Sequence, residues 1–217
     1  MVGEGDTAIV HCYDIFGYNA GRTRLMVDQM ADAGNLVILP DLYHGDSWPI
    51  DKEIGMETFA WVKNFQIEKV LADLTDRVLP YLAEKGAKKV GISGTCWGAW
   101  VVLNASTTGK FSAGVSWHPS FQICGIFGGS EVEVAGKINT PQLVLPAEND
   151  QANVMKDGDV TKAMISSVGE DKVEHKVYAG TAHGYMTRGD LETESVRVAV
   201  KDGMERAIAF FGKYLKS

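Results

Sequence analysis

The stretch VGISGTCWGAW, residues 90–100, runs from a β-like apolar segment into a glycine-rich turn and then into small and apolar residues. The spacing of Gly94, Cys96 and Gly98 within it is that of the G-x-S-x-G elbow, in which a strand turns sharply into a helix and presents a nucleophile. The central residue here is cysteine instead of serine. The stretch therefore predicts a sheet flanked by helices, with Cys96 either a nucleophile or a buried thiol.

Six short apolar runs, typical of buried parallel strands, are spaced along the chain at residues 7–13, 35–40, 88–93, 111–117, 141–147 and 173–179. Helical periodicity lies between them, at residues 20–33, 56–84 with a break near Gln66, 97–107, 154–168 and 196–214. This alternation predicts an α/β fold, a mostly parallel sheet of about six or more strands with helices on both faces. We expect residues 1–217 to form a single domain.

Residues 42–66 fit this scheme less well, because they follow a strand and can overhang its carboxyl end. We expect them to form a lid or to cover a pocket. The aromatic residues within 48–65 suit either the apolar face of such a lid or ordinary helix packing, and the sequence leaves both interpretations open.

The composition limits the partners and compartments of the protein. A formal net charge of −7 without a Lys/Arg cluster argues against nucleic acid or membrane as partner. No apolar run approaches the roughly 20 residues that span a bilayer, and residues 1–14 do not resemble a signal peptide. Cys12, Cys96 and Cys124 are too few for a disulfide framework, which fits a reducing compartment. We expect a cytoplasmic monomer or homodimer that binds a small molecule.

Three candidate catalytic residues follow predicted strands, where open α/β sheets bind their ligands. Cys96, Asp150 and His183 come after the third, fifth and sixth runs. The order nucleophile, acid, histidine is that of α/β-hydrolases. In such a triad His183 takes the proton of Cys96 or pairs with the thiolate, and Asp150 orients the imidazole. Glu148, in the same loop, is a rival for the acid.

The backbone around Cys96 can supply the remaining chemistry. The dipole of the helix that begins near Trp97 favours a thiolate at its N-terminus. A developing oxyanion needs two donors, and we expect them to be the N–H groups of Trp97 and Ile15. The alternative is a non-catalytic binding or redox-sensing protein with a reactive thiol, which would need neither Asp150 nor His183.

Four other side chains are candidates for the pocket or for a partner of the thiol: Asp14, Tyr43, His118 and Arg188. Asp14 has two interpretations. Its charge lies beside Cys96 and opposes thiolate formation until substrate displaces it, or its carboxylate only caps the turn into IFGYN, residues 15–19.

We expect no metal and no cofactor. Asp41, His44 and Asp46 are metal-ligating residue types close together, but no second cluster in the sequence completes a site.

Motifs along nearly the whole chain resemble the dienelactone hydrolase family: YDIFGYN (13–19), LPDLYHGD (39–46), GISGTCWGAW (91–100), LPAENDQ (145–151) and YAGTAHGYMTRGD (178–190). The resemblance implies an α/β-hydrolase fold whose Cys-His-Asp triad, here Cys96, His183 and Asp150, hydrolyses small lactones or activated esters without a cofactor. HPSF (118–121) and HGYMTRGD (183–190) are more similar to the eukaryotic branch than to bacterial members. A thioesterase or broad carboxylesterase on the same triad is the alternative.

The chain departs from the family pattern at three places. Asp14 stands where the family often has a glutamate that partners the resting thiol. Bacterial members hold a substrate carboxylate between two arginines; Arg188 fits one of them, but residues 48–66 contain no arginine for the other. Family members usually begin with an antiparallel strand pair, whereas about six residues precede the first predicted strand here.

Overall fold

The computed structural model describes residues 1–216, and its six strands form one sheet. The strands are β1 (Thr7–Cys12), β2 (Leu36–Ile38), β3 (Lys89–Cys96), β4 (Gly114–Pro119), β5 (Gln142–Leu145) and β6 (Val173–His175). Their order across the sheet is β2-β1-β3-β4-β5-β6, and every pairing between neighbours is parallel. The predicted parallel sheet is confirmed.

Both edges of the sheet differ slightly from the prediction. β6 ends at His175, yet the N–H groups of Lys176 and Tyr178 still donate to the carbonyl oxygens of Val144 and Pro146, each at 3.1 Å. Pairing with the β5 segment therefore continues irregularly to Tyr178. At the opposite edge, Val2 pairs antiparallel with Val37 through two backbone hydrogen bonds of 3.0 and 2.9 Å. The residues before β1 therefore already extend the sheet by one antiparallel contact.

The helices follow the predicted segments. The longer ones are α1 (Thr23–Asp32), α2 (Met56–Val62), α3 (Ile67–Asp73), α4 (Leu79–Glu84), α5 (Trp97–Ala105), α8 (Asp159–Val168) and α10 (Glu194–Leu215). The break predicted near Gln66 separates α2 from α3. A π-helical turn, Leu74–Val78, joins α3 to α4 just before Pro80, whose ring nitrogen cannot donate a helical hydrogen bond.

Three short helices, α6 (Ile123–Ile126), α7 (Glu131–Ala135) and α9 (Tyr185–Arg188), occupy segments where periodicity predicts none. With four or five residues each, they are too short to show a repeat in the sequence. Helix α8 begins later than its predicted start at 154, because a 3₁₀ turn, Ala152–Val154, precedes it. A second 3₁₀ turn, Glu170–Lys172, leads into β6.

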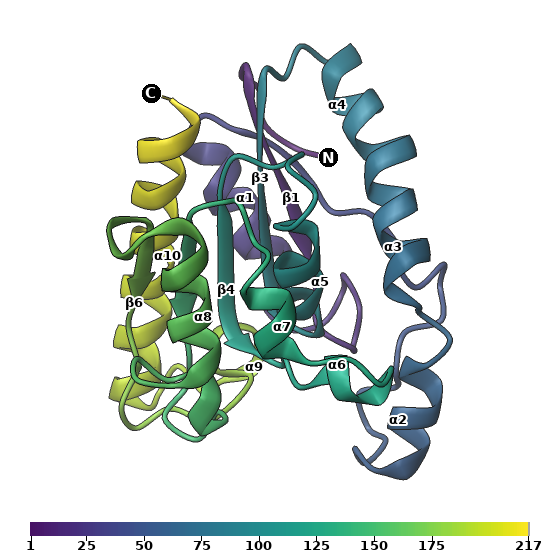
Figure 1. Cartoon of the computed structure of the whole chain (residues 1–217), viewed down its shortest axis with the longest axis vertical. Coiled ribbons are helices and arrows are strands. Elements are labelled where there is room, and N and C mark those ends of the chain that lie inside the picture. The colour runs from purple at the N-terminus through teal and green to yellow at the C-terminus, as the bar shows by residue number, and fades with distance from the viewer. Residues whose placement is uncertain (217) are drawn as a thin grey trace.

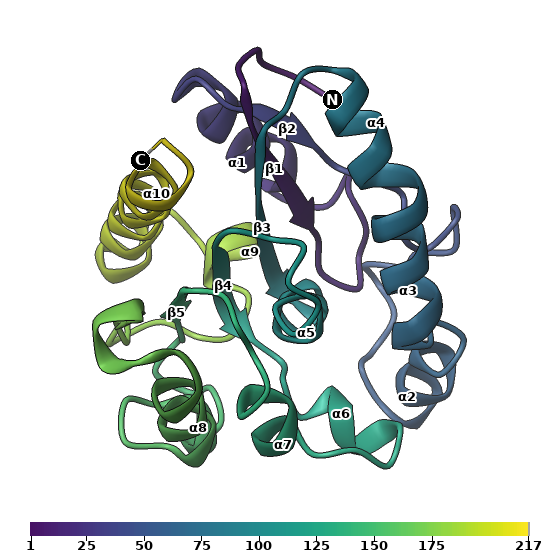
Figure 2. The ribbon, with the colours of Figure 1, turned by 45° about the horizontal axis from the view of Figure 1, so that its top comes forward.

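Helices cover both faces of the sheet (Figure 1, Figure 2). Alternate residues of β1 show why, since successive side chains of a strand point to opposite faces. Ala8 and Val10 pack in a core shared with α3, α4 and α5, whereas Ile9 packs in a second core with α1 and α10. Helices α7 and α8 extend the first layer over β5. Helices α2, α6 and α9 gather at the end of the sheet toward which the β4 arrow points (Figure 1).

Most aromatic residues of segment 42–66 pack within the fold, and one lines a cavity. Trp61 and Phe65 surround the ring of Tyr43, with centroid distances of 4.9 and 4.7 Å, and Trp48 packs on Trp61 at 5.8 Å. These aromatic residues are ordinary packing. In contrast, Phe59 lines a cavity at the carboxyl end of the sheet.

Candidate active site

Cys96 ends β3 and directly precedes α5, at the carboxyl edge of the sheet. Its backbone has φ 53° and ψ −112°, a conformation that residues other than glycine rarely adopt. Close packing explains the two glycines that flank it. A Cβ on Gly98 would lie 2.0 Å from the carbonyl oxygen of Cys12, and one on Gly94 would lie 2.3 Å from the backbone of Gly98. The chain is therefore held in a strained strand-to-helix elbow with Cys96 at its centre.

The structure brings Asp150 and His183 together from the loops after β5 and β6. Oδ1 of Asp150 lies 2.6 Å from Nδ1 of His183. The Asp150 side chain is 2% exposed and that of His183 is 33% exposed, so the carboxylate lies deeper than the ring that it contacts. Glu148 instead accepts a hydrogen bond from the N–H of Gly180 at 2.7 Å. Of the two acids in this loop, Asp150 is the one that contacts the imidazole.

The charge of His183 results from opposing effects. Burial lowers the pKa of the imidazole, but the charges and hydrogen bonds of Cys96 and Asp150 outweigh burial and raise this pKa from 6.5 to about 10. Two acidic neighbours favour the protonated ring. His183 therefore carries a proton at neutral pH when it faces a thiolate.

Ser120, which was not singled out from the sequence, lies between Cys96 and His183. Its Oγ is 3.4 Å from Sγ of Cys96 and 3.5 Å from Nε2 of His183. Its backbone N–H donates to the carbonyl oxygen of Cys96 at 3.2 Å, which ties the loop after β4 to the elbow. The only signal in the sequence was its place just after the fourth strand, in HPSF (118–121).

Two backbone N–H groups are available as donors near Cys96. Trp97 is the first residue of α5, a position whose N–H has no partner within its helix. Ile15 and Cys96 line the same cavity. The N–H of Ile15 makes no hydrogen bond within residues 1–216, whereas the next N–H, of Phe16, donates to Oδ1 of Asp14 at 3.0 Å.

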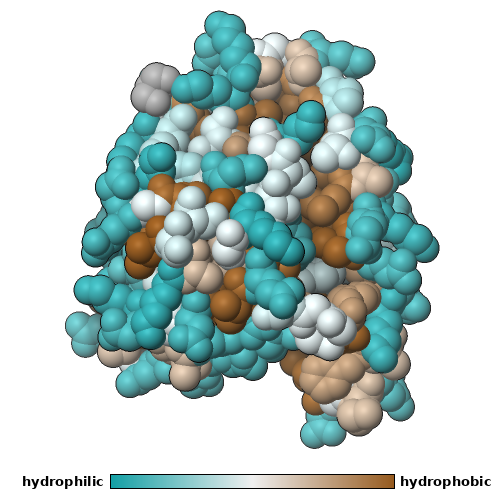
Figure 3. Space-filling view, viewed as in Figure 1, coloured by the Kyte–Doolittle hydropathy of each residue, from teal (hydrophilic) through white to brown (hydrophobic). Residues whose placement is uncertain are grey.

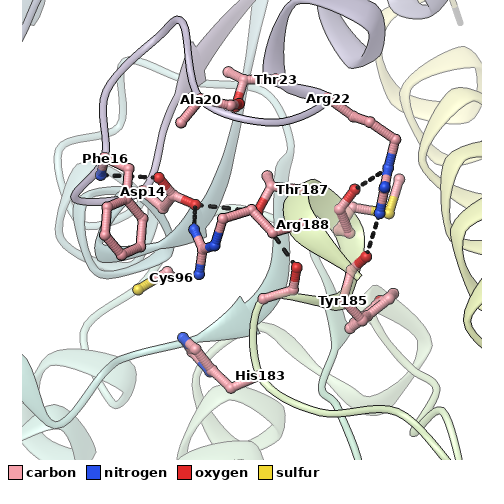
Figure 4. Close-up of polar contacts among 12 residues, drawn as sticks. Asp14, Phe16, Ala20, Arg22, Thr23, Cys96, His183, Tyr185, Thr187 and Arg188 are labelled. Atoms are coloured by element: carbon pink, nitrogen blue, oxygen red, sulfur yellow. Dashed lines mark hydrogen bonds and ion pairs between the residues drawn. The ribbon is translucent and has the colours of Figure 1, made fainter. Parts of the chain in front are cut away.

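The carboxylate of Asp14 contacts Arg188 and Thr187 rather than the thiol of Cys96. Its fully buried carboxylate pairs with Nη1 of Arg188 and accepts a hydrogen bond from Oγ1 of Thr187 at 3.0 Å (Figure 4). No hydrogen bond joins it to Cys96 within residues 1–216. Burial raises the pKa of the Asp14 carboxyl, while Arg188, the N–H of Phe16 and Thr187 oppose that rise. The carboxylate thus caps the turn at Phe16 and anchors Arg188.

Arg22, also not singled out from the sequence, fixes the segment that carries Arg188. Its guanidinium donates to the carbonyl oxygens of Tyr185, Gly189 and Met186 at 2.7, 2.8 and 3.2 Å. Figure 4 shows the contact with Tyr185. These carbonyls lie on and just after α9, at the end of the helix, and that of Tyr185 also accepts the backbone N–H of Gly189 at 3.2 Å. The start of α1 is thereby joined to α9, the short helix that follows His183.

Three of the four expected pocket residues, Asp14, Tyr43 and His118, do not line the cavity. Tyr43 is 1% exposed and its ring packs on Trp97 at a centroid distance of 4.6 Å. His118 has φ 35° and is fully buried, with its ring against those of His183 and Tyr185 at 5.0 and 5.5 Å. Burial lowers the pKa of His118 well below its usual value, so its ring is neutral. His118 therefore lies behind the catalytic candidates as packing.

Of the candidates from the sequence, the described residues that share one cavity of about 390 Å³ at the carboxyl edge of the sheet are Ile15, Cys96, Asp150, His183 and Arg188. Its polar wall includes Cys96, Ser120, Asp150, His183 and Arg188. Segment 42–66 supplies Ile54, Thr58, Phe59 and Val62, and α6 with its preceding residues supplies Gln122, Ile123 and Ile126. The segment expected to cover a pocket thus forms one wall of it.

Within residues 1–216 no group of three or more His, Cys, Asp or Glu side chains is arranged to hold a metal ion. His44, one of the residues that resembled a ligand, instead lies 3.3 Å from a carboxylate oxygen of Asp73. None of the helices in the described chain is long and apolar enough to cross a membrane.

Known proteins resemble this chain over nearly its whole length. The model of the dienelactone hydrolase family matches residues 4–215. A carboxymethylenebutenolidase homolog of Mus musculus is 32% identical over 226 residues, which cover 98% of this chain and 84% of the relative. Hydrolase tropI of Talaromyces stipitatus is 27% identical over 215 residues, covering 94% and 80%. The crystal structure of dienelactone hydrolase from Anabaena variabilis has a TM-score of 0.66 at 16% identity, covering 98% of this chain and 88% of that one.

Proposed function

The chain belongs to the dienelactone hydrolase family and is a hydrolase of ester or lactone bonds, and from that premise we propose that Cys96 is its nucleophile and that it acts through a thioester acyl-enzyme. The observation that carries the proposal is the strained elbow at Cys96, whose sulfur shares a cavity with the Asp150–His183 pair. A strained nucleophile beside an oriented imidazole is the arrangement that acyl transfer needs.

In the first half of the reaction the thiolate of Cys96 attacks the carbonyl carbon of the substrate, and a C–S bond forms. The carbonyl π electrons move to oxygen, where the N–H groups of Trp97 and Ile15 stabilise the negative charge. The intermediate collapses, the bond between the carbonyl carbon and the alcohol oxygen breaks, and protonated His183 gives its proton to the leaving oxygen. In a lactone this alcohol stays attached to the acyl group.

In the second half neutral His183 accepts a proton from a water molecule that attacks the thioester carbonyl. The C–S bond then breaks, the electron pair returns to sulfur, and the product leaves as a carboxylic acid. Asp150 keeps Nδ1 of His183 as a donor throughout, which leaves Nε2 free to exchange the proton. His183 and the thiolate of Cys96 thus end as they began.

The preorganised charges favour this assignment over a thiol that only reports redox state. A sensor needs a reactive sulfur, but it needs neither a carboxylate held 2.6 Å from an imidazole nor an unpaired N–H at Ile15. On the same cysteine content that suggested a reducing compartment, we expect the enzyme to work in the cytoplasm.

The proposal is tested by assaying a panel of p-nitrophenyl esters, lactones and acyl thioesters with the wild type and with Cys96→Ala. We expect turnover of small esters or lactones by the wild type and loss of that turnover in Cys96→Ala. Iodoacetamide should label Cys96 ahead of Cys12, which is fully buried, and ahead of Cys124, which is 5% exposed, with a parallel loss of activity. Full activity after complete labelling of Cys96 would contradict the proposal.

A further inference from the structure

The walls of the catalytic cavity separate into a polar side that carries the reacting groups and an apolar side. Ile54, Phe59 and Val62 form the apolar side on one flank, and Ile123 and Ile126 form it on the other. Gln122, Asn149 and Gln151 are the neutral polar residues at its border. A group of the substrate that lies between the two flanks would exchange water for hydrocarbon contacts.

Several of these apolar side chains are left open to solvent. Ile54, just before α2, is 60% exposed, and Phe59 of α2 is 46% exposed. Met56, the first residue of α2, is 83% exposed. Figure 3 shows apolar side chains gathered over α2, at the lower right of the molecule. Large apolar side chains that stand together at the mouth of a cavity gain from being covered by an apolar ligand.

The charges of the cavity do not offer a site for an anion. Among the described residues that line it, Arg188 is the only lysine or arginine. Its guanidinium pairs with Asp14, a carboxylate with no solvent exposure, and its Cζ lies 4.1 Å from the centre of the Phe16 ring. Figure 4 shows the guanidinium between Asp14 and the sulfur of Cys96. The positive charge of Arg188 is thus already balanced by Asp14, and the positive charge of protonated His183 faces the thiolate of Cys96 and the carboxylate of Asp150.

A substrate carboxylate would have to compete with Asp14 for Arg188. Asp14 would then remain buried with only the N–H of Phe16 and the hydroxyl of Thr187 as partners. A buried carboxylate that loses its counter-ion is strongly destabilised. Asp150, whose side chain lines the cavity, would in addition repel the substrate carboxylate.

We propose that the cavity selects uncharged substrates with an apolar acyl or alcohol group, seated between α2 and α6, and that the Asp14–Arg188 pair disfavours substrates carrying a carboxylate. This inference rests on the proposed function for the identity of the reaction. It concerns the charge and polarity of the group that the site accepts, which can be measured apart from turnover.

The first test uses two alkylating reagents that differ in charge and by one methyl group, the methyl ester of p-(bromoacetyl)benzoate and p-(bromoacetyl)benzoate itself. Their rates at Cys96 are measured by peptide mass spectrometry in about 0.5 M salt, which screens distant charges. The neutral-to-anionic rate ratio is divided by the same ratio for a small neutral thiol, N-acetylcysteine amide. We expect a normalised ratio of about tenfold or more in favour of the neutral reagent. A normalised ratio of one or less would overturn the inference.

The second test is a matched ester pair, p-nitrophenyl hexanoate and mono-p-nitrophenyl adipate, each corrected for spontaneous hydrolysis. We expect kcat/KM to favour the hexanoate by about tenfold or more, and a preference for the adipate would contradict the inference. If neither ester is hydrolysed but the alkylation ratio still favours the neutral reagent, the proposed function fails and this inference stands.

Variants show whether the Asp14–Arg188 pair is the cause. Asp14→Asn keeps an oxygen that can accept from the N–H of Phe16 but releases the charge of Arg188. It should raise the rate of the anionic reagent relative to the neutral one by about tenfold. Glu148→Gln is the matched control, because it removes one negative charge from the exposed side chain that bonds Gly180 and does not contact Arg188. An equal change in both variants, or no change in Asp14→Asn, would refute the assigned role of the pair.

Discussion

Asp150 holds His183 with one carboxylate oxygen and is itself held by the other. Oδ1 lies 2.6 Å from Nδ1 of His183, while Oδ2 accepts the backbone N–H of Ala147 at 2.8 Å. The backbone N–H of His183 also donates to Oδ1 of Asn149 at 2.7 Å, so both the ring and the backbone of His183 are bonded to the loop after β5. Both the tautomer and the direction of the imidazole are thereby fixed.

Replacing Asp150 with asparagine should leave the shape of the site intact and lower kcat by roughly 10³-fold to 10⁴-fold, because the amide can present its N–H to the ring and stabilise the wrong tautomer. Glu148→Gln, in the same loop, should change kcat far less, since Glu148 bonds only the N–H of Gly180. Steady-state kinetics on one activated ester would compare the two. A larger loss in Glu148→Gln would reverse the assignment of the acid.

The raised pKa of His183 predicts how stability changes with pH. The folded chain binds a proton on His183 up to about pH 10, whereas the unfolded chain releases it near pH 6.5. The stabilisation from this proton is therefore fully present below pH 6.5 and is lost as the pH rises through about 10. Between these limits Tm should fall more steeply for the wild type than for His183→Gln, measured by calorimetry. Parallel Tm profiles would show that His183 is not protonated in the folded state.

Ser120→Ala should lower the rate of acylation by up to about tenfold, because one hydroxyl contact to Cys96 and one to His183 are lost. The effect is limited because sulfur is a weak hydrogen-bonding partner and the contact to His183, at 3.5 Å, is long. Ser120→Cys, which keeps a weaker donor of similar size, should recover part of the rate. Stopped-flow release of p-nitrophenol measures acylation directly. A rate unchanged in Ser120→Ala would mean that the hydroxyl only fills space.

The positions of the three candidate catalytic residues could be predicted from the sequence, whereas the contacts that support them could not. Cys96, Asp150 and His183 follow different strands, and parallel strands place their carboxyl ends at one edge. His118 is the second-last residue of β4 and Ser120 directly follows the strand. Because the backbone turns at His118, with φ 35°, the sequence pattern does not tell which of the two faces the cavity.

Contacts between residues far apart in the sequence could not be predicted either. Asp14 and Arg188 are 174 residues apart, and their pairing depends on where the four-residue helix α9 docks. Arg22 sets that position by bonding the carbonyl groups of α9, and no periodic pattern marks such a contact. From the sequence Asp14 was either a neighbour of the thiol or a cap of the following turn. The structure shows the cap contact with the N–H of Phe16 and adds the pairing with Arg188, which the sequence did not suggest.

Gly98→Ala should disrupt the elbow, because the added methyl group would lie 2.0 Å from the carbonyl oxygen of Cys12. Overpacking against backbone costs about 1–3 kcal/mol or more and should also displace Cys96. Gly212→Ala in α10 is the matched control, since nothing lies within 4 Å of its added methyl, and it should be neutral or stabilise the helix. Urea unfolding of both variants gives the comparison. Equal stability of Gly98→Ala and the wild type would contradict the packing argument.

The central claim, that Cys96 carries the acyl group during turnover, is tested most directly by trapping the acyl-enzyme. The wild type is mixed with excess p-nitrophenyl acetate, quenched in acid during turnover and digested for peptide mass spectrometry, with Asp150→Asn as a second sample in which deacylation is slowed. The account predicts one acetyl group on the peptide that contains Cys96, removed by neutral hydroxylamine as a thioester should be. Turnover with the acetyl group on Ser120, or with no acetyl group on Cys96 in either sample, would contradict it.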